Sequence, residues 1–218
     1  MQLFSSYHNV PTLIVPGLHG SGPAHWQSWW QAVVPGALRV EQDDWSLPDI
    51  GEWTDRLLQT VVHQPEPVWL VAHSFGCLTA VNALAQRSHN IAGVFLVAAA
   101  DPARFGLDEA LPLSSLPVPA AMVISSNDPW LTENKALGLA QRWGAEVFSI
   151  GAAGHVNTAA GFGPWIEGLV LFRDFVRSKA GAEIVTCGHA GPVYTPSAFH
   201  APTGASARRL VRVIISEA

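Results

Sequence analysis

Ser74 stands where a long apolar run ends, between small residues in the stretch 72–76. The run before it is typical of a buried strand, and the residues after it have helical spacing. A serine on a tight strand-to-helix turn is typical of a nucleophile elbow, which holds the hydroxyl clear of the sheet. Ala72 replaces the usual first glycine and adds only one methyl group. The pentapeptide alone is equally typical of an ordinary turn, so the rest of the chain must decide.

A serine hydroxyl attacks a carbonyl carbon only when a base removes its proton and a third group orients that base. His155 follows the last predicted strand, in a loop rich in glycine and alanine, and is the predicted base. The acid should precede the histidine along the chain. Asp128, just past the fifth predicted strand, is the first choice, because one helix and one strand separate it from His155. Asp101, past the fourth predicted strand, is the alternative, and the unused acid is expected to cap a helix or turn.

Backbone N–H groups must stabilise the oxyanion that forms when the serine attacks. One predicted donor is Phe75, the residue after Ser74. The second is expected in the glycine-rich loop 15–23, where the backbone can approach a substrate closely. We choose Leu18, with His19 as the alternative. The loop lacks both glycine patterns of a phosphate cradle, so nucleotide binding is not expected.

Strand-like and helix-like segments alternate along the chain. This alternation predicts an α/β fold, a three-layer sandwich around a mostly parallel six-stranded sheet. We take the strand order to be 2-1-3-4-5-6. In that order the loop after the first strand lies beside the turn at Ser74, at the end of the sheet where ligands bind. The predicted strands are 12–16, 38–41, 68–73, 94–98, 120–124 and 146–150, and the predicted helices are 24–34, 50–63, 77–86, 131–143 and 165–178.

Composition narrows the class of protein. The 218 residues suit one domain, and 49% hydrophobic against 13% charged residues indicate a large core. No apolar window reaches the roughly eighteen residues of a membrane span, and no secretory signal is visible, so we expect a cytoplasmic protein that binds no membrane. A formal net charge of -5 argues against nucleic acid as a partner.

Neither the histidines nor Cys77 and Cys187 have the spacing of metal ligands, so no metal and no cofactor are expected. Cys77 is predicted to be a small core residue.

With these features placed, the chain resembles the α/β-hydrolase superfamily and, within it, the small serine hydrolases related to retinoblastoma-binding protein 9. The resemblance covers roughly residues 10–178 and is carried by 15–17, Trp26, 73–76, 126–129, 154–157 and 161–163. It implies a hydrolase without a cap domain, in which Ser74, Asp128 and His155 form a catalytic triad. The Leu-x-Cys-x-Glu motif tied to retinoblastoma binding is absent, so that partner is not expected.

The substrate should be a small acyl compound. Trp26, Trp130 and Phe162 lie near the predicted site loops and are the predicted apolar walls of a pocket. Residues 101–119, between the fourth and fifth predicted strands, leave room for a loop and one short helix. The pocket is therefore expected to be shallow and open, favouring short acyl esters or thioesters over long lipids.

Residues 1–178 are predicted to form the serine hydrolase domain, and residues 179–218 a C-terminal tail whose structure the sequence does not define. Within the tail, residues 208–215 alternate as a strand would, with the sheet edge or a second subunit of a homo-oligomer as candidate partners. The predicted function is cleavage of carboxylic esters or related acyl bonds through an acyl-enzyme. Thioesterase or amidase chemistry would use the same residues, and a non-catalytic binding module on this scaffold is the alternative from another class.

Overall fold

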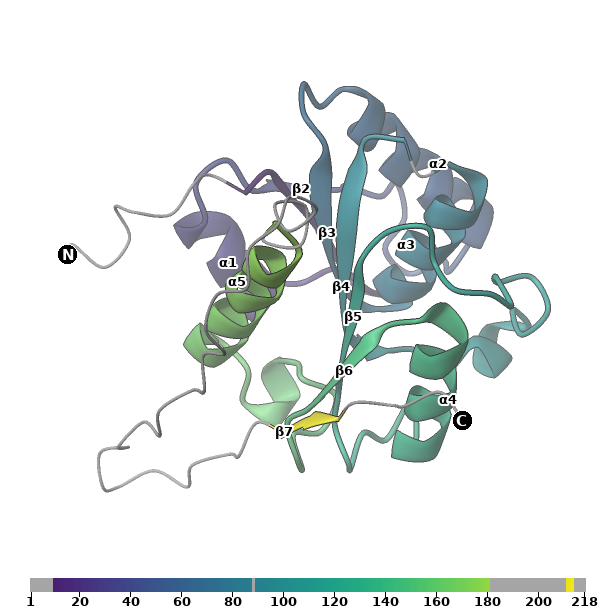
Figure 1. Cartoon of the computed structure of the whole chain (residues 1–218), viewed down its shortest axis with the longest axis vertical. Helices are drawn as coiled ribbons and strands as arrows, with labels where there is room; N and C mark the ends of the chain where they lie inside the picture. Colours follow the sequence, from purple (N-terminus) through teal and green to yellow (C-terminus); the bar gives the residue numbers. More distant parts are fainter. Residues whose placement is uncertain (1–9, 88, 181–210, 214–218) are drawn as a thin grey trace, which may run out of the picture.

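The computed structural model describes residues 10–87, 89–180 and 211–213, which form one sheet of seven strands with helices on both faces (Figure 1). The strands are β1 Thr12–Val15, β2 Leu38–Arg39, β3 Val68–Ser74, β4 Ile91–Ala99, β5 Ala120–Ile124, β6 Glu146–Ser149 and β7 Val211–Val213. They lie in the order β2-β1-β3-β4-β5-β6-β7. Strands β1 to β6 pair in parallel, and β7 pairs antiparallel with β6.

Helices cover both faces of the sheet, with α1 and α5 on one face and α2, α3 and α4 on the other (Figure 1). Their bounds are α1 Trp26–Val33, α2 Ile50–Val62, α3 Phe75–Gln86, α4 Glu133–Trp143 and α5 Ile166–Ala180, and two short 3-10 helices are η1 Pro102–Phe105 and η2 Thr158–Ala160. Because both faces are covered, the strands read as nearly continuous apolar runs.

Two hydrophobic cores lie on either side of the sheet, because successive strand side chains point to opposite faces. In β1, Leu13 and Val15 pack into the core under α2, α3 and α4, whereas Ile14 packs into the core under α1 and α5. Trp30 and Phe172 are large, fully buried members of this second core. The cores hold β1, β3, β5 and β6 rigidly, and the loops after these strands carry the residues of the candidate site.

The predicted α/β sandwich and the strand order 2-1-3-4-5-6 are confirmed. Helix α3 begins at Phe75 rather than Cys77, because the turn before it consists of the single residue Ser74. Strand β4 begins not at residue 94 but at Ile91, where it pairs with Val68 of β3, and Gly93 within it leaves space for an aromatic ring. A Cβ on Gly93 would lie 2.3 Å from the ring of Trp69.

The structure describes two parts of the predicted tail, the end of α5 and strand β7. Helix α5 ends at Ala180, beyond the predicted domain boundary at residue 178. Strand β7 lies within the predicted strand 208–215 and pairs with β6 at the sheet edge. Cys187 and the rest of the tail lie outside the described residues.

Three further expectations concern burial and insertions. Cys77 is fully buried, as predicted, and burial raises the pKa of its thiol. Residues 100–119, between β4 and β5, contain one short helix, η1, and no inserted domain. Among residues 10–87, 89–180 and 211–213, no helix has the length and apolar character needed to cross a membrane.

Gly76, in the first turn of α3, packs directly against the backbone at the end of β1. A Cβ on Gly76 would lie 2.4 Å from the Pro16 carbonyl oxygen and 2.5 Å from the Val15 carbonyl oxygen, both rigid backbone atoms. Gly76→Ala should therefore lower the free energy of unfolding by at least about 2 kcal/mol, measured by urea denaturation. Gly138→Ala is the matched control, because Gly138 is exposed on α4 with nothing within 4 Å of an added Cβ. It should raise stability by about 0.5–1 kcal/mol. Equal stability of the two variants would contradict the close packing.

Candidate active site

Ser74 forms the turn between β3 and α3 with a backbone conformation that few residues other than glycine adopt. Its φ is 54° and its ψ is -124°. Such strain persists only where the surroundings enforce it. Here the first loop presses on the turn, since a Cβ on Gly17 would lie 2.7 Å from Ser74 Cβ. The predicted strand–turn–helix geometry at Ser74 is present, with the glycine-rich loop directly against it.

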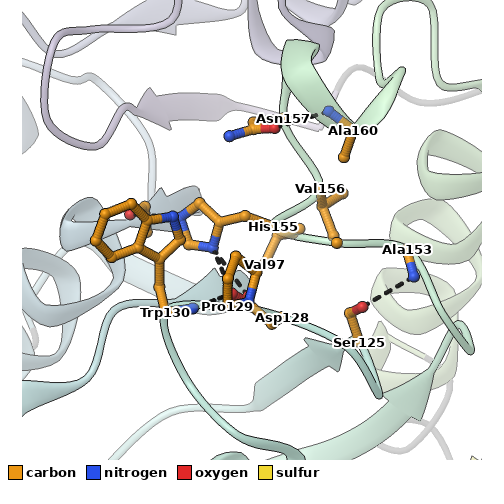
Figure 2. A network of polar contacts seen from close by, with 12 residues as sticks. Val97, Ser125, Asp128, Pro129, Trp130, Ala153, His155, Val156, Asn157 and Ala160 are labelled. Carbon is orange, nitrogen blue, oxygen red and sulfur yellow. Dashed lines mark hydrogen bonds and ion pairs between the residues drawn. The ribbon is translucent and has the colours of Figure 1, made fainter.

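His155 lies between Ser74 and Asp128. Its Nε2 is 2.9 Å from Ser74 Oγ. Its Nδ1 is 2.9 Å and 3.0 Å from the two Asp128 carboxylate oxygens (Figure 2). An ionised carboxylate only accepts hydrogen bonds, so Nδ1 carries the proton and Nε2 accepts the Ser74 hydroxyl. The side chains of His155 and Asp128 are 8% and 3% exposed, so little water competes for these bonds. A serine held in this way can pass its proton to the imidazole as it attacks an electrophile.

Asp128, and not the alternative Asp101, contacts His155. Asp101 instead caps η1, where its carboxylate accepts a hydrogen bond of 3.2 Å from the Ala103 N–H. Its other oxygen lies 2.6 Å from Lys135 Nζ. The expectation that the remaining acid would cap a helix or turn therefore holds for Asp101.

The backbone of the His155 loop is held from the β5 side by two polar side chains. Ser125 Oγ accepts a hydrogen bond from the Ala153 N–H at 2.9 Å (Figure 2). Asn127 Oδ1 accepts one from the Gly154 N–H at 2.7 Å. The loop that carries Asp128 therefore also fixes the two residues that precede His155, which sets the distance between acid and base.

The same loop is held from below by His73 and Trp26. His73 Nε2 donates to the carbonyl oxygen of His155 at 2.9 Å, and Trp26 Nε1 donates to that of Val156 at 2.8 Å. Both donors are buried. Sequence reasoning assigned no role to His73, although a histidine inside an otherwise apolar strand needs a buried hydrogen-bond partner. The need for such a partner was the feature of the sequence that could have drawn attention to His73.

The predicted oxyanion donors, Phe75 and Leu18, belong to two segments that touch beside Ser74. A Cβ on Gly17 would lie 3.3 Å from the nitrogen of Phe75, so the loop before Leu18 touches the start of α3. The alternative donor, His19, is engaged elsewhere, because its N–H donates to the Trp45 carbonyl at 2.8 Å. The Leu18 N–H has no acceptor among the residues that the structure describes. Phe75 and Leu18 are therefore the pair of donors that the geometry favours.

Gln27, which sequence reasoning did not single out, ties this loop to the sheet. It is fully buried, and its Nε2 donates to the carbonyl oxygens of Val15 at 3.2 Å and Val71 at 3.0 Å. Its Oε1 accepts a hydrogen bond of 2.6 Å from Ser21 Oγ. One side chain thus links β1, β3 and the far end of the glycine-rich loop. A glutamine amid the tryptophans of an apolar helix was the only hint in the sequence.

A cleft of about 760 Å³ opens at the carboxyl ends of the strands, above Ser74 and His155. Of the three predicted wall residues, Trp130 lines this cleft; it is 51% exposed, and its ring centroid lies 6.3 Å from that of His155. The prediction for Trp26 and Phe162 is wrong. Both are buried against Trp165 in the core under α1 and α5, because nearness in sequence to a site loop does not place a side chain above the sheet.

Two buried histidines beside the cleft stay neutral. Burial, with the nearby charges of Arg39 and His155, lowers the pKa of His25 to about 4. Burial, followed by the neighbouring His25 and His155, lowers the pKa of His73 well below its usual range. The described part of the chain holds no group of three or more His, Cys, Asp or Glu side chains arranged for a metal ion.

Comparisons with known proteins agree with this geometry. Residues 12–174 match the family described as serine hydrolase. The solved structure of a YdeN-like hydrolase from Pectobacterium atrosepticum is 39% identical, with a TM-score of 0.74, over 77% of this chain and 90% of its own. The ydeN gene product of B. subtilis is 22% identical, with a TM-score of 0.64, over 76% of this chain and 98% of its own. Mouse α/β hydrolase domain-containing protein 10 is 16% identical, with a TM-score of 0.57, over 78% of this chain and 90% of its own. The similarity to the last two structures shows only that they share the fold of this chain. None of the curated proteins compared matches the chain.

His25 should make the protein sensitive to acid. Its Nδ1 caps α1 by accepting the Gln27 N–H, and protonation would abolish that bond. Below pH 6.5 the unfolded chain takes up a proton that the folded state refuses until about pH 4. The free energy of unfolding should therefore fall by up to about 3 kcal/mol from this group as the pH drops over that window.

The measurement is urea unfolding between pH 7 and pH 4.5. His25→Asn keeps a capping side chain but not the titration, so its stability should fall less steeply with acid. His63→Asn, at an exposed position at the end of α2, is the control and should follow the unaltered protein. An unchanged slope in His25→Asn would contradict the assignment.

Proposed function

We propose that this chain, which belongs to the serine hydrolase family, cleaves carboxylic esters or related acyl bonds of small substrates through an acyl-enzyme. The observation that carries the proposal is the continuous hydrogen-bonded series from Ser74 Oγ through His155 to Asp128, with separations of 2.9 Å at both links. Ser74 and His155 line a cleft large enough for a small molecule.

In the proposed mechanism Ser74 Oγ forms a bond to the substrate carbonyl carbon while His155 Nε2 takes the hydroxyl proton. The bond to the leaving group then breaks, and His155 returns that proton to the departing oxygen or nitrogen. Water next attacks the acyl-enzyme, giving its proton to His155, and the carboxylic acid leaves as Ser74 regains a proton. Asp128 keeps Nδ1 protonated and stabilises the imidazolium in both halves of the reaction.

Phe75 and Leu18 are the proposed oxyanion donors. Their backbone N–H groups need no reorganisation when charge develops on the substrate oxygen, and such donors are commonly worth a hundredfold or more in rate. Gly17 supports this role, because only a residue without Cβ lets the first loop approach Ser74 closely enough.

The proposed substrates have short acyl groups. The cleft is bounded by the loop that carries η1, and the described residues between β4 and β5 form no inserted domain that could bury a long chain. Thioesters and amides of similar size would meet the same groups, and the ester is proposed as the probe. Equal turnover of p-nitrophenyl butyrate and p-nitrophenyl palmitate would contradict a short-chain preference.

The triad is tested by hydrolysis of p-nitrophenyl butyrate. Ser74→Ala and His155→Ala should lose nearly all turnover, because each removes a reacting group. Asp128→Asn should lower kcat on the order of 10⁴-fold, since an amide no longer holds the required tautomer of His155.

Asp101→Asn is the matched control, because it makes the same change at the acid that caps η1. Its turnover should stay within a few-fold of the unaltered enzyme, with circular dichroism confirming that each variant is folded. A larger loss in Asp101→Asn than in Asp128→Asn would overturn the assignment of the acid.

A further inference from the structure

The cleft carries one cation that the proposed chemistry does not use. Arg104, exposed on η1, lines the wall that also includes Trp130 and His155. Its Cζ lies 5.0 Å from the centroid of the Trp130 ring, and that ring lies 6.3 Å from the ring of His155. The guanidinium and the proposed base are therefore both neighbours of the Trp130 ring.

The other charges along this wall are already paired. Asp101 contacts Lys135 at 2.6 Å, and Asp128 contacts His155 at 2.9 Å. Arg104 forms no ion pair among the residues that the structure describes. This side of the cleft thus presents an unneutralised positive charge to whatever occupies it, although the chain as a whole has a formal net charge of -5.

Trp130 holds the Arg104 side chain in a conformation suited to binding an anion. Stacking on an aromatic ring orients the guanidinium but leaves the donors in its plane available. The one hydrogen bond of this group to a described residue, from Nη2 to the Pro129 carbonyl, is long at 3.5 Å. Most of its donors are therefore available to a carboxylate, which a guanidinium can bind through two parallel hydrogen bonds.

The position of His155 decides which part of a substrate reaches this group. In the proposed mechanism the leaving group takes its proton from His155 Nε2, so it must lie against that imidazole and the Trp130 ring beside it. The acyl oxygen is directed away, toward Phe75 and Leu18. We infer that Arg104 and Trp130 form a subsite for a carboxylate on the leaving group, so that the favoured substrates are short acyl esters of hydroxy acids. This inference rests on the proposed ester hydrolysis.

The test compares two esters that differ only in the charge of the leaving group, 4-carboxyphenyl butyrate and 4-carbamoylphenyl butyrate. The ratio of their kcat/KM values should fall about tenfold in Arg104→Gln, through KM, because a charge-assisted hydrogen bond is lost. Comparing the ratio across variants cancels the intrinsic reactivity of the two esters. Arg87→Gln, which removes an exposed arginine outside this cleft, is the control and should leave the ratio unchanged.

The outcomes separate the two proposals. Hydrolysis of both esters with a ratio that Arg104→Gln does not alter would overturn the subsite and leave the esterase proposal standing. An equal fall in Arg87→Gln would also overturn it, since overall charge would then explain the effect. Hydrolysis of neither ester, nor of p-nitrophenyl butyrate, would overturn the proposed function and the subsite with it.

Discussion

The strained turn at Ser74 is the constraint that sets the positions of the other site residues. A φ of 54° at a non-glycine residue is maintained only because β3 and α3 are both anchored in buried cores and the first loop presses on the turn. Gly17 and Gly76 make that contact sterically allowed, since a Cβ on either would meet atoms within 2.7 Å. The same contact brings the Leu18 segment beside Phe75. The proposed nucleophile and the proposed oxyanion donors are thus positioned by one packing arrangement.

The proposed base depends on a different arrangement, made of hydrogen bonds rather than packing. Side chains from the β5 loop bind the N–H groups before His155, and buried side chains of β3 and α1 bind the carbonyls of His155 and Val156. His73 donates from Nε2, and burial lowers its pKa well below the usual range, so it makes this bond as a neutral imidazole. The ends of β3, β5 and β6 therefore meet at one fixed point, beside the exposed side chain of Trp130.

Features that depend on local pattern were predictable from the sequence. Alternating strand-like and helix-like segments predicted the parallel sheet, and small residues around Ser74 together with chain order indicated Ser74, Asp128 and His155. Contacts between distant segments were not predictable in this way. The burial of Trp26 and Phe162 depends on how α1 and α5 cross the sheet, and the roles of Gln27 and His73 depend on which carbonyls lie opposite them. The position of Arg104 over Trp130 depends on where η1 lies beside the cleft.

Activation of Ser74 can be tested by covalent labelling of the purified protein with a fluorophosphonate, followed by peptide mass mapping. The probe reacts only with an activated serine, so the geometry of Ser74, His155 and Asp128 predicts an adduct on Ser74 and none in the Ser74→Ala variant. Absence of an adduct in folded protein would contradict an activated nucleophile. The scaffold would then be better explained as a binding module that keeps the hydrolase fold without its chemistry.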